Sequence, residues 1–378
     1  MNSRERVLAA LNHQEPDRVP IDLGSSVVTS ITKGAYVAVR RELGLPARPV
    51  EIADQVQQLA HVEEDLLARL GVDFRGVQPN PPSNWKLELF DEGDYWAFYD
   101  EWGSKLRMPK AGGYYFDWVD YPIKESTLEA LARYRWPDPD DPARYAGLRE
   151  RARQLYETTD CALVGTAPLG SDLLAVPQRT RGYAESMLDL AADEAFVEAF
   201  LERLTQIALR AWSHFLDAVG EYIHVAVTFE DLGTQIGPLI SPAQYRRILK
   251  PRQARIVQLI KSRSRAKVFL HSCGAVADLI PDFVDVGIDI LDPVQVTARG
   301  MEDTAKLKRE YGRDIVFWGA GCAPITLALG TPDDVRAEAR RRLADLAPGG
   351  GYVFAPVHNV QDDVPSANVV ALFQAARE

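Results

Sequence analysis

The chain alternates short apolar runs, rich in β-branched residues, with longer amphipathic stretches, and this alternation continues to its last residues. Apolar runs of four to eight residues bounded by turn residues predict buried strands, whereas apolar positions three and four apart predict helices. A repeated strand–helix pattern indicates a parallel sheet. The eight predicted strands cover residues 19–23, 72–78, 162–166, 223–228, 267–270, 288–291, 314–318 and 352–355.

Eight parallel strands predict an α/β protein with a (β/α)8 TIM-type barrel, here as one domain over residues 1–378; an open doubly wound sheet is the alternative. No G-x-G-x-x-G follows the first strand, which argues against a dinucleotide-binding sheet. A helix is predicted over residues 3–11, with Ser3 as its N-cap. Residues 80–125 are rich in aromatic residues and glycine, and we expect a β-hairpin insertion beside the barrel mouth.

Composition and charge narrow the class of protein further. Of the 378 residues, 46% are hydrophobic and 26% charged, which is typical of a soluble globular protein. The net charge of −11 argues against nucleic acid or an anionic membrane as a partner. No run approaches the roughly 18 apolar residues that cross a bilayer, and the charged N-terminus lacks a secretory pattern. We therefore expect a cytoplasmic protein.

The three cysteines are far apart in sequence and odd in number, so a disulfide framework is not expected. Cys161 begins a predicted strand at the end associated with stability, and we interpret it as a core residue. Cys322 lies in a glycine-rich strand end, where an inert thiol is the more typical role and a metal ligand is the alternative. Cys273 follows a histidine at another strand end and belongs to the candidate site.

Polar residues follow five of the predicted strands. Catalytic groups of such barrels come from the carboxyl ends of the strands and from the loops after them, so these segments are expected to surround one site. The strand-end segments are residues 228–231, 271–274, 292–295, 319–322 and 358–361.

His271 and Cys273 form the most specific pattern, because residues two apart on an extended backbone point to the same face. Imidazole and thiolate together suit zinc. His358 is the best third ligand, and Asp231 or Glu230 would supply an oxygen. Glu230 and Asp231 are adjacent, so only one of them should enter the pocket. A buried structural histidine beside a core cysteine is the alternative to a metal site.

Other polar residues favour structural roles. His13, His61 and His214 lie in predicted helical stretches and His224 lies early in a strand, where a structural histidine is the more common role. Asp22, at the end of the first strand, would either face the barrel mouth or cap the following turn.

Five segments together resemble the uroporphyrinogen decarboxylase superfamily. The likeness extends over nearly the whole chain and is strongest from about residue 220 onward. The superfamily contains the decarboxylases themselves and zinc-dependent methyltransferases that work with methylated corrinoid proteins, and both have an eight-stranded barrel. The segments are residues 4–11 (RERVLAAL), 16–20 (PDRVP), 231–235 (DLGTQ), 271–274 (HSCG) and 356–365 (PVHNVQDDVP).

One departure from the decarboxylases and one match to the methyltransferases place the chain nearer to the methyltransferase branch. The decarboxylases have an N-terminal Arg-Gln-Ala-Gly-Arg segment for the substrate carboxylates, whereas residues 19–26 here hold Asp22 and no arginine. The methyltransferases have His-x-Cys with a distant second cysteine. His271 and Cys273 match the first part, and His358 appears in place of the second cysteine unless Cys322 takes that position.

The resemblance implies a methyltransferase that moves a methyl group between a small methylated substrate or a thiol and a corrinoid (cobalamin) on a partner protein. The implied cofactor is Zn²⁺, and a homodimer is common among relatives. A metal-free decarboxylase or lyase is the first alternative, and a non-catalytic barrel is the second. The expected zinc ligands are His271, Cys273, His358 and Asp231, with Cys322 as a substitute; the expected catalytic residues are Asp231 and His358, and the expected substrate contacts are Glu230, Gln295, Asn359 and Gln361.

Overall fold

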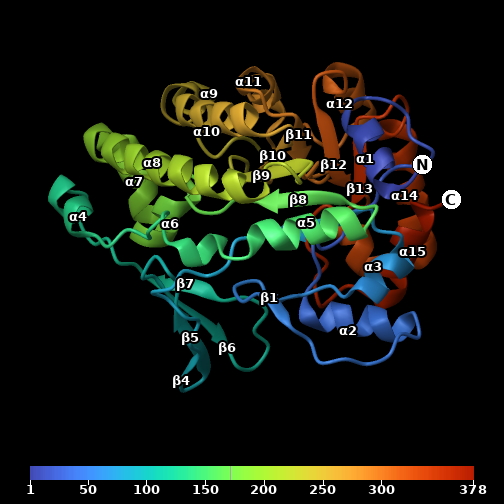
Figure 1. Cartoon of the computed structure of the whole chain (residues 1–378), viewed down its shortest axis with the longest axis horizontal. Coiled ribbons are helices and arrows are strands. Elements are labelled where there is room, and N and C mark those ends of the chain that lie inside the picture. Colours follow the sequence, from blue (N-terminus) through green and yellow to red (C-terminus); the bar gives the residue numbers. More distant parts are fainter. Residues whose placement is uncertain (171) are drawn as a thin grey trace.

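The computed structural model describes residues 1–170 and 172–378. Its largest sheet has seven parallel strands in the order β13-β12-β11-β10-β9-β8-β3, and helices surround it in Figure 1. The strands are β3 (Phe74–Val77), β8 (Ala162–Thr166), β9 (Val225–Phe229), β10 (Lys267–His271), β11 (Ile290–Asp292), β12 (Val316–Ala320) and β13 (Tyr352–Ala355).

The predicted first strand is reduced to a bridge that closes the sheet. Ile21 pairs in parallel with Phe354 of β13. The N–H of Asp22 donates to the carbonyl of Phe354 at 2.9 Å, and on the other side the N–H of Asp73 donates to the carbonyl of Ile21 at 2.9 Å. Residues 20–22 therefore join β13 to β3, and the predicted (β/α)8 barrel is confirmed.

The barrel has an inner and an outer apolar layer because strand residues alternate between two faces. Val225 and Val227 of β9, with Phe269 of β10, belong to the inner cluster. Their neighbours Ala226 and Val268 belong to the larger cluster, which includes helix residues. This alternation fixes Phe229, His271 and Asp292, at the ends of their strands, on the inner face.

Helices cover the outside of the barrel, and α8 packs on α10. The helix α1 matches the predicted range, but its N-cap is Asn2 and not Ser3, because the Asn2 side chain accepts from the N–H of Glu5 in a capping box. No helix of the described ranges 1–170 and 172–378 has the length and apolar character that a membrane span needs. The helices are α1 (Ser3–Leu11), α2 (Lys33–Glu42), α3 (Glu64–Leu70), α4 (Leu128–Arg133), α5 (Leu148–Thr158), α6 (Ala175–Arg181), α7 (Tyr183–Ala192), α8 (Glu194–Val219), α9 (Pro242–Gln244), α10 (Lys250–Arg263), α11 (Ile280–Val286), α12 (Thr304–Tyr311), α13 (Pro324–Leu329), α14 (Pro332–Leu346) and α15 (Ser366–Ala375).

The aromatic-rich segment forms more than the single hairpin that was predicted. Four antiparallel strands pair in the order β4-β5-β6-β7 and project from one side of the barrel in Figure 1. Phe98 and Phe116 pack edge to face in a small core of their own. A short pair, β1 and β2, precedes this sheet. These strands are β1 (Ile52–Asp54), β2 (Leu59–Ala60), β4 (Phe90–Glu92), β5 (Tyr95–Tyr99), β6 (Lys105–Pro109) and β7 (Asp117–Asp120).

Candidate metal centre

Three of the predicted ligands meet at the carboxyl end of the barrel. Ligand atoms of His271, Cys273 and His358 all lie within 4.8 Å of one another. The Sγ of Cys273 is 3.3 Å from the Nε2 of His271, and the two imidazole centroids are 5.5 Å apart. Around a tetrahedral zinc, with bonds of about 2.0–2.3 Å, ligand atoms lie roughly 3–4 Å apart. The spacing and the donor types therefore fit a zinc ion.

A buried carboxylate orients the first ligand. The Nδ1 of His271 lies 2.6 Å from Oδ1 of Asp292, whose side chain is 1% exposed. When Nδ1–H donates to Asp292, loss of the Nε2 proton leaves a lone pair on the side of Cys273, where a metal ion would take the place of that proton. Zinc-bound histidines use such a carboxylate partner to fix ring and tautomer. Asp292 lies in the predicted strand-end segment 292–295 but had no predicted role, although it pairs with His271 across neighbouring strands.

The two histidines have opposite pKa shifts. Burial alone would lower the pKa of His271, but the Cys273 sulfur, Asp292 and Asp231 together raise it well above its usual value. Burial, with a contribution from His271, lowers the pKa of His358 to about 4. His358 is therefore neutral at neutral pH and has a lone pair available for a metal ion.

Asp231 and Glu230 point to opposite sides, as predicted. The Asp231 side chain is 55% exposed, and its Oδ1 lies 3.8 Å from the Nε2 of His271. The same oxygen accepts the N–H of Cys273 at 2.9 Å. Asp231 thus stands beside the three-residue group, where it can contact a bound molecule.

Glu230 is fully buried and faces a different part of the chain. Its two carboxylate oxygens accept the backbone N–H groups of Leu173 and Leu174, at 3.1 and 2.7 Å. Burial, followed by Asp172, raises the pKa of Glu230 well above its usual value. Glu230, which was predicted to contact substrate, therefore anchors the loop after β8.

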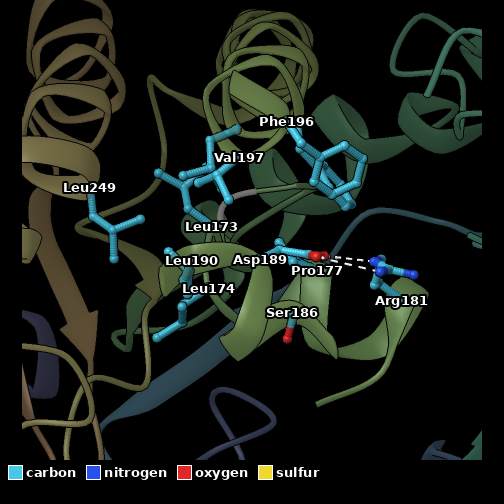
Figure 2. A pocket seen from close by; sticks show the side chains of 12 residues that line it. Leu173, Leu174, Pro177, Arg181, Ser186, Asp189, Leu190, Phe196, Val197 and Leu249 are labelled. Carbon is cyan, nitrogen blue, oxygen red and sulfur yellow. Dashed lines mark hydrogen bonds and ion pairs between the residues drawn. The ribbon is translucent and has the colours of Figure 1, made fainter. Parts of the chain in front are cut away.

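Apolar packing holds the same loop from behind. Figure 2 shows Leu173 and Leu174 lining an apolar pocket together with Phe196 of α8 and Leu249, while Arg181 and Asp189 form an ion pair at its side. Glu230 holds the backbone of this loop, and two of its side chains lie in the pocket. Asp172, which directly precedes Leu173, therefore has a defined position.

Asp172 is a site residue that the sequence analysis missed. Its side chain is 13% exposed, and its Oδ2 lies 3.5 Å from a guanidinium nitrogen of Arg179. Burial raises the pKa of Asp172, Arg179 opposes that shift, and Asp231 adds to it. Because Asp172 also interacts electrostatically with His271, it belongs to the surroundings of the metal centre. Nothing in its local sequence distinguishes it from an ordinary loop aspartate.

The three remaining predicted substrate contacts hold loops around the centre. Gln295 accepts the N–H of Gly274 at 2.7 Å. Asn359 accepts the N–H of Ser30 at 2.7 Å and donates to Gln57 at 2.9 Å. Gln361 donates to the Asn359 carbonyl and accepts the hydroxyl of Tyr115. Asn359 and Gln361 lie within three residues of His358 in the sequence, and Gln295 contacts Gly274, the residue after Cys273.

Cys322 lies away from this group. It is fully buried, and its Sγ donates to Glu338 of α14 at 3.6 Å. Burial, followed by Glu338, raises the pKa of the Cys322 thiol strongly. Cys161 is also buried, with a raised pKa, as a core residue should be.

Asp22 lies inside the barrel, where it accepts the Trp318 N–H at 3.2 Å. Burial raises the pKa of Asp22 to about 7.

The other histidines lie outside the three-residue group. His13 and His61 lie outside helices, contrary to the prediction, because α1 ends at Leu11 and α3 begins at Glu64. His214 lies on α8, as predicted, and pairs with Asp140 at 3.0 Å. The Nδ1 of His224 accepts the N–H of Leu163 at 3.0 Å, and burial lowers its pKa to about 4.

Comparisons with known proteins agree with this architecture. A uroporphyrinogen decarboxylase from Synechococcus sp. (strain CC9605) is 24% identical over 193 residues, which are 48% of this chain and 51% of that protein. The chain thus spans about half the length of this curated relative. A solved structure, a methyltransferase from Methanosarcina mazei, is 19% identical to this chain and matches it with a TM-score of 0.64. The match covers 100% of this chain and 98% of that structure. At that identity the likeness shows the shared fold.

The family assignment rests on a longer match. The model of the family described as Uroporphyrinogen decarboxylase (URO-D) matches residues 99–378. This range contains β8 to β13 and every residue of the metal centre. Since it is well over half of the sequence, the chain belongs to the uroporphyrinogen decarboxylase (URO-D) family.

Proposed function

We propose that the protein is a zinc-dependent methyltransferase that moves a methyl group between a small methylated substrate or thiol and a corrinoid on a partner protein. The observation that carries this proposal is the cluster of His271, Cys273 and His358, with ligand atoms within 4.8 Å and Asp292 behind His271. Two imidazoles and one thiolate are zinc ligands, and three protein ligands leave a position for an exchangeable molecule.

When bound, zinc would supply a Lewis acid that shifts the charge of a sulfur or oxygen at that position. The chain's own residues prepare the site for this chemistry. Asp292 fixes the orientation of His271, and burial keeps His358 neutral. Asp231, held by the N–H of Cys273, presents an exposed carboxylate beside the cluster, where it can accept a proton or a hydrogen bond from the substrate.

Methyl transfer is also the activity in the name of the Methanosarcina mazei protein, which supports this choice within the shared fold. The corrinoid would approach from the carboxyl ends of the strands, because Asp231 and Cys273 are accessible there.

A metal-free decarboxylase or lyase is the second candidate. The curated relative is named a uroporphyrinogen decarboxylase, and Asp231 lies close enough to the two histidines to influence the pKa of each. In this case Asp231 and His358 would act as acid–base and orienting groups. Full activity after complete chelation would favour this candidate over methyl transfer.

The test is the metal content of purified protein by mass spectrometry, for the native chain and for His271→Ala, Cys273→Ser and the matched control Cys322→Ser. We expect near-stoichiometric zinc in the native and control proteins and its loss in the other two. The same samples are assayed for demethylation of methylcobalamin with 2-mercaptoethanol as the acceptor, before and after chelation. A native chain that binds no zinc even after reconstitution contradicts the proposal.

A further inference from the structure

The loops that follow β9 and β10 run side by side at the barrel mouth, beyond the ends of the two strands. The N–H of Glu230 donates to the carbonyl of His271 at 2.9 Å, which continues the parallel pairing of the sheet. The N–H of Leu232 then donates to the hydroxyl oxygen of Ser272 at 3.2 Å. The loop that carries Cys273 therefore lies directly against the loop after β9.

Two glycines allow the backbones of these loops to come into contact. A Cβ atom on Gly233 would lie 2.8 Å from the amide nitrogen of Ala275 and closer still to the carbonyl oxygen of Cys273. A Cβ atom on Gly274, whose φ is +89°, would lie 2.5 Å from the carbonyl carbon of Gly233. Non-bonded carbon atoms prefer separations of about 3.5–4.0 Å. A side chain at Gly233 would therefore have to displace the turn that begins at Cys273.

Three successive backbone N–H groups of this turn donate to acceptors outside it. Two of the acceptors belong to the loop after β9, and the third belongs to the loop after β11. Because all three N–H groups already have partners, these bonds hold the turn in place and leave no N–H free for an anionic substrate group. The pairs are Cys273 with Asp231 at 2.9 Å, Gly274 with Gln295 at 2.7 Å, and Ala275 with the Thr234 carbonyl at 2.7 Å.

We propose that Gly233 and Gln295 are positioning residues for the Cys273 thiol. Gly233 lets the turn lie against the β9 loop, and Gln295 holds the turn from the side of β11. In this arrangement the Cys273 sulfur is 3.3 Å from the Nε2 of His271. Ligands of a metal site must be held within roughly 0.5 Å of the productive geometry, so a displaced turn would disrupt this pair. The inference rests on the proposed function only for the role of Cys273 as a zinc ligand.

The test substitutes Gly233→Ala and uses Gly237→Ala, in the same loop, as the matched control. A Cβ atom on Gly237 would meet no atom within 4 Å, and neither glycine has a positive φ, so only the first variant crowds the turn. Hydrogen exchange of zinc-free protein is followed by mass spectrometry of peptides that span residues 273–275. We expect exchange at least about tenfold faster in Gly233→Ala, because its hydrogen bonds open more readily, and native rates in Gly237→Ala.

Metal binding supplies a second readout. Zinc affinity, measured by competition with a chelator, should fall about tenfold in Gly233→Ala and stay native in Gly237→Ala. With Co²⁺ in place of zinc, the thiolate-to-cobalt absorption should weaken or shift only in Gly233→Ala. Gln295→Met keeps the length of the side chain but removes the acceptor, and it should produce the same changes to a smaller extent. If Gly233→Ala does not fold, Gln295→Met decides the proposal.

Native exchange rates at the turn in both Gly233→Ala and Gln295→Met overturn the inference, and so does equal acceleration in Gly237→Ala. Faster exchange combined with native zinc affinity and an unchanged cobalt spectrum also overturns it, because the contacts would then stabilise the turn without positioning the thiol. If the native chain binds no zinc, the proposed function fails, and the exchange rates still decide whether these two residues hold the turn at Cys273.

Discussion

Two strand ends of the barrel each carry a cysteine, and they differ in every respect that matters for metal binding. After β10, Cys273 is half-buried, with its sulfur 3.3 Å from the Nε2 of His271. After β12, Cys322 is fully buried and donates to Glu338 of an outer helix. One thiol faces the barrel mouth, and the other packs beneath α14.

The difference indicates that a cysteine at a strand end can act as a metal ligand only where other donors meet it at the barrel mouth. His271 lies two positions before Cys273, and His358 arrives from β13. Cys322 meets a carboxylate in an apolar layer, which raises its pKa and disfavours the thiolate that metals need. A cysteine at the end of a barrel strand is therefore not by its position alone a metal ligand.

Zinc affinity should separate the two strand ends most strongly. Cys273→Ser and His271→Ala are each expected to weaken zinc binding more than about 100-fold, because loss of a direct ligand exceeds the roughly 10–100-fold cost of losing a supporting contact. Cys322→Ser should keep the native affinity. Competition with a chromophoric chelator measures all three, and a large loss in Cys322→Ser would reverse the comparison.

Thiol reactivity should differ next. In the folded, zinc-free protein we expect iodoacetamide to modify Cys273 about 100-fold faster than Cys322, because only thiolates react and burial raises the pKa of Cys322. Peptide mapping by mass spectrometry gives both rates. Denaturant should abolish the difference and zinc should protect Cys273, whereas equal rates in the folded chain would show that Cys322 is accessible.

The carboxylate behind His271 should have a smaller effect. Asp292→Asn retains the shape of the side chain but removes the charge that accepts Nδ1–H, so zinc affinity should fall about tenfold. Asp333→Asn serves as the exposed control. Native zinc affinity in Asp292→Asn would mean that Asp292 does not orient this ligand.

The smallest effect concerns stability. Cys322→Ala removes a buried sulfur and should lower the free energy of unfolding by about 1 kcal/mol, without changing zinc content. Cys273→Ala in the zinc-free protein should change it by less than about 0.5 kcal/mol, because that side chain is only half-buried. Denaturant titration of both variants provides the comparison, and equal losses would contradict it.

Much of the barrel could be predicted from apolar periodicity. Residues 162–166 and 352–355 coincide with β8 and β13, because turn residues bound these fully buried runs. The first strand is shorter than predicted: only Ile21 forms a bridge, since the chain leaves the barrel wall for the turn at residues 26–29. In the aromatic-rich segment, pairing among four short strands depends on contacts that periodicity does not specify.

The candidate site was only partly predictable. His271 and Cys273 are recognisable because they are two residues apart, and His358 because it follows the last strand. Asp292 and Asp172 are important only through neighbours on other strands and loops, which the linear order does not reveal. Glu230 was expected to contact substrate, but strand alternation directs it to the backbone of the β8 loop.

We propose that one thiolate and two imidazoles of this chain bind a single zinc ion. X-ray absorption at the zinc edge of the zinc-loaded protein tests it most directly. We predict one sulfur at about 2.3 Å together with nitrogen or oxygen ligands at about 2.0–2.1 Å, and complete loss of the sulfur contribution in Cys273→Ser. A sulfur-free shell in the native protein, or a sulfur that persists in Cys273→Ser and disappears in Cys322→Ser, would contradict this ligand assignment.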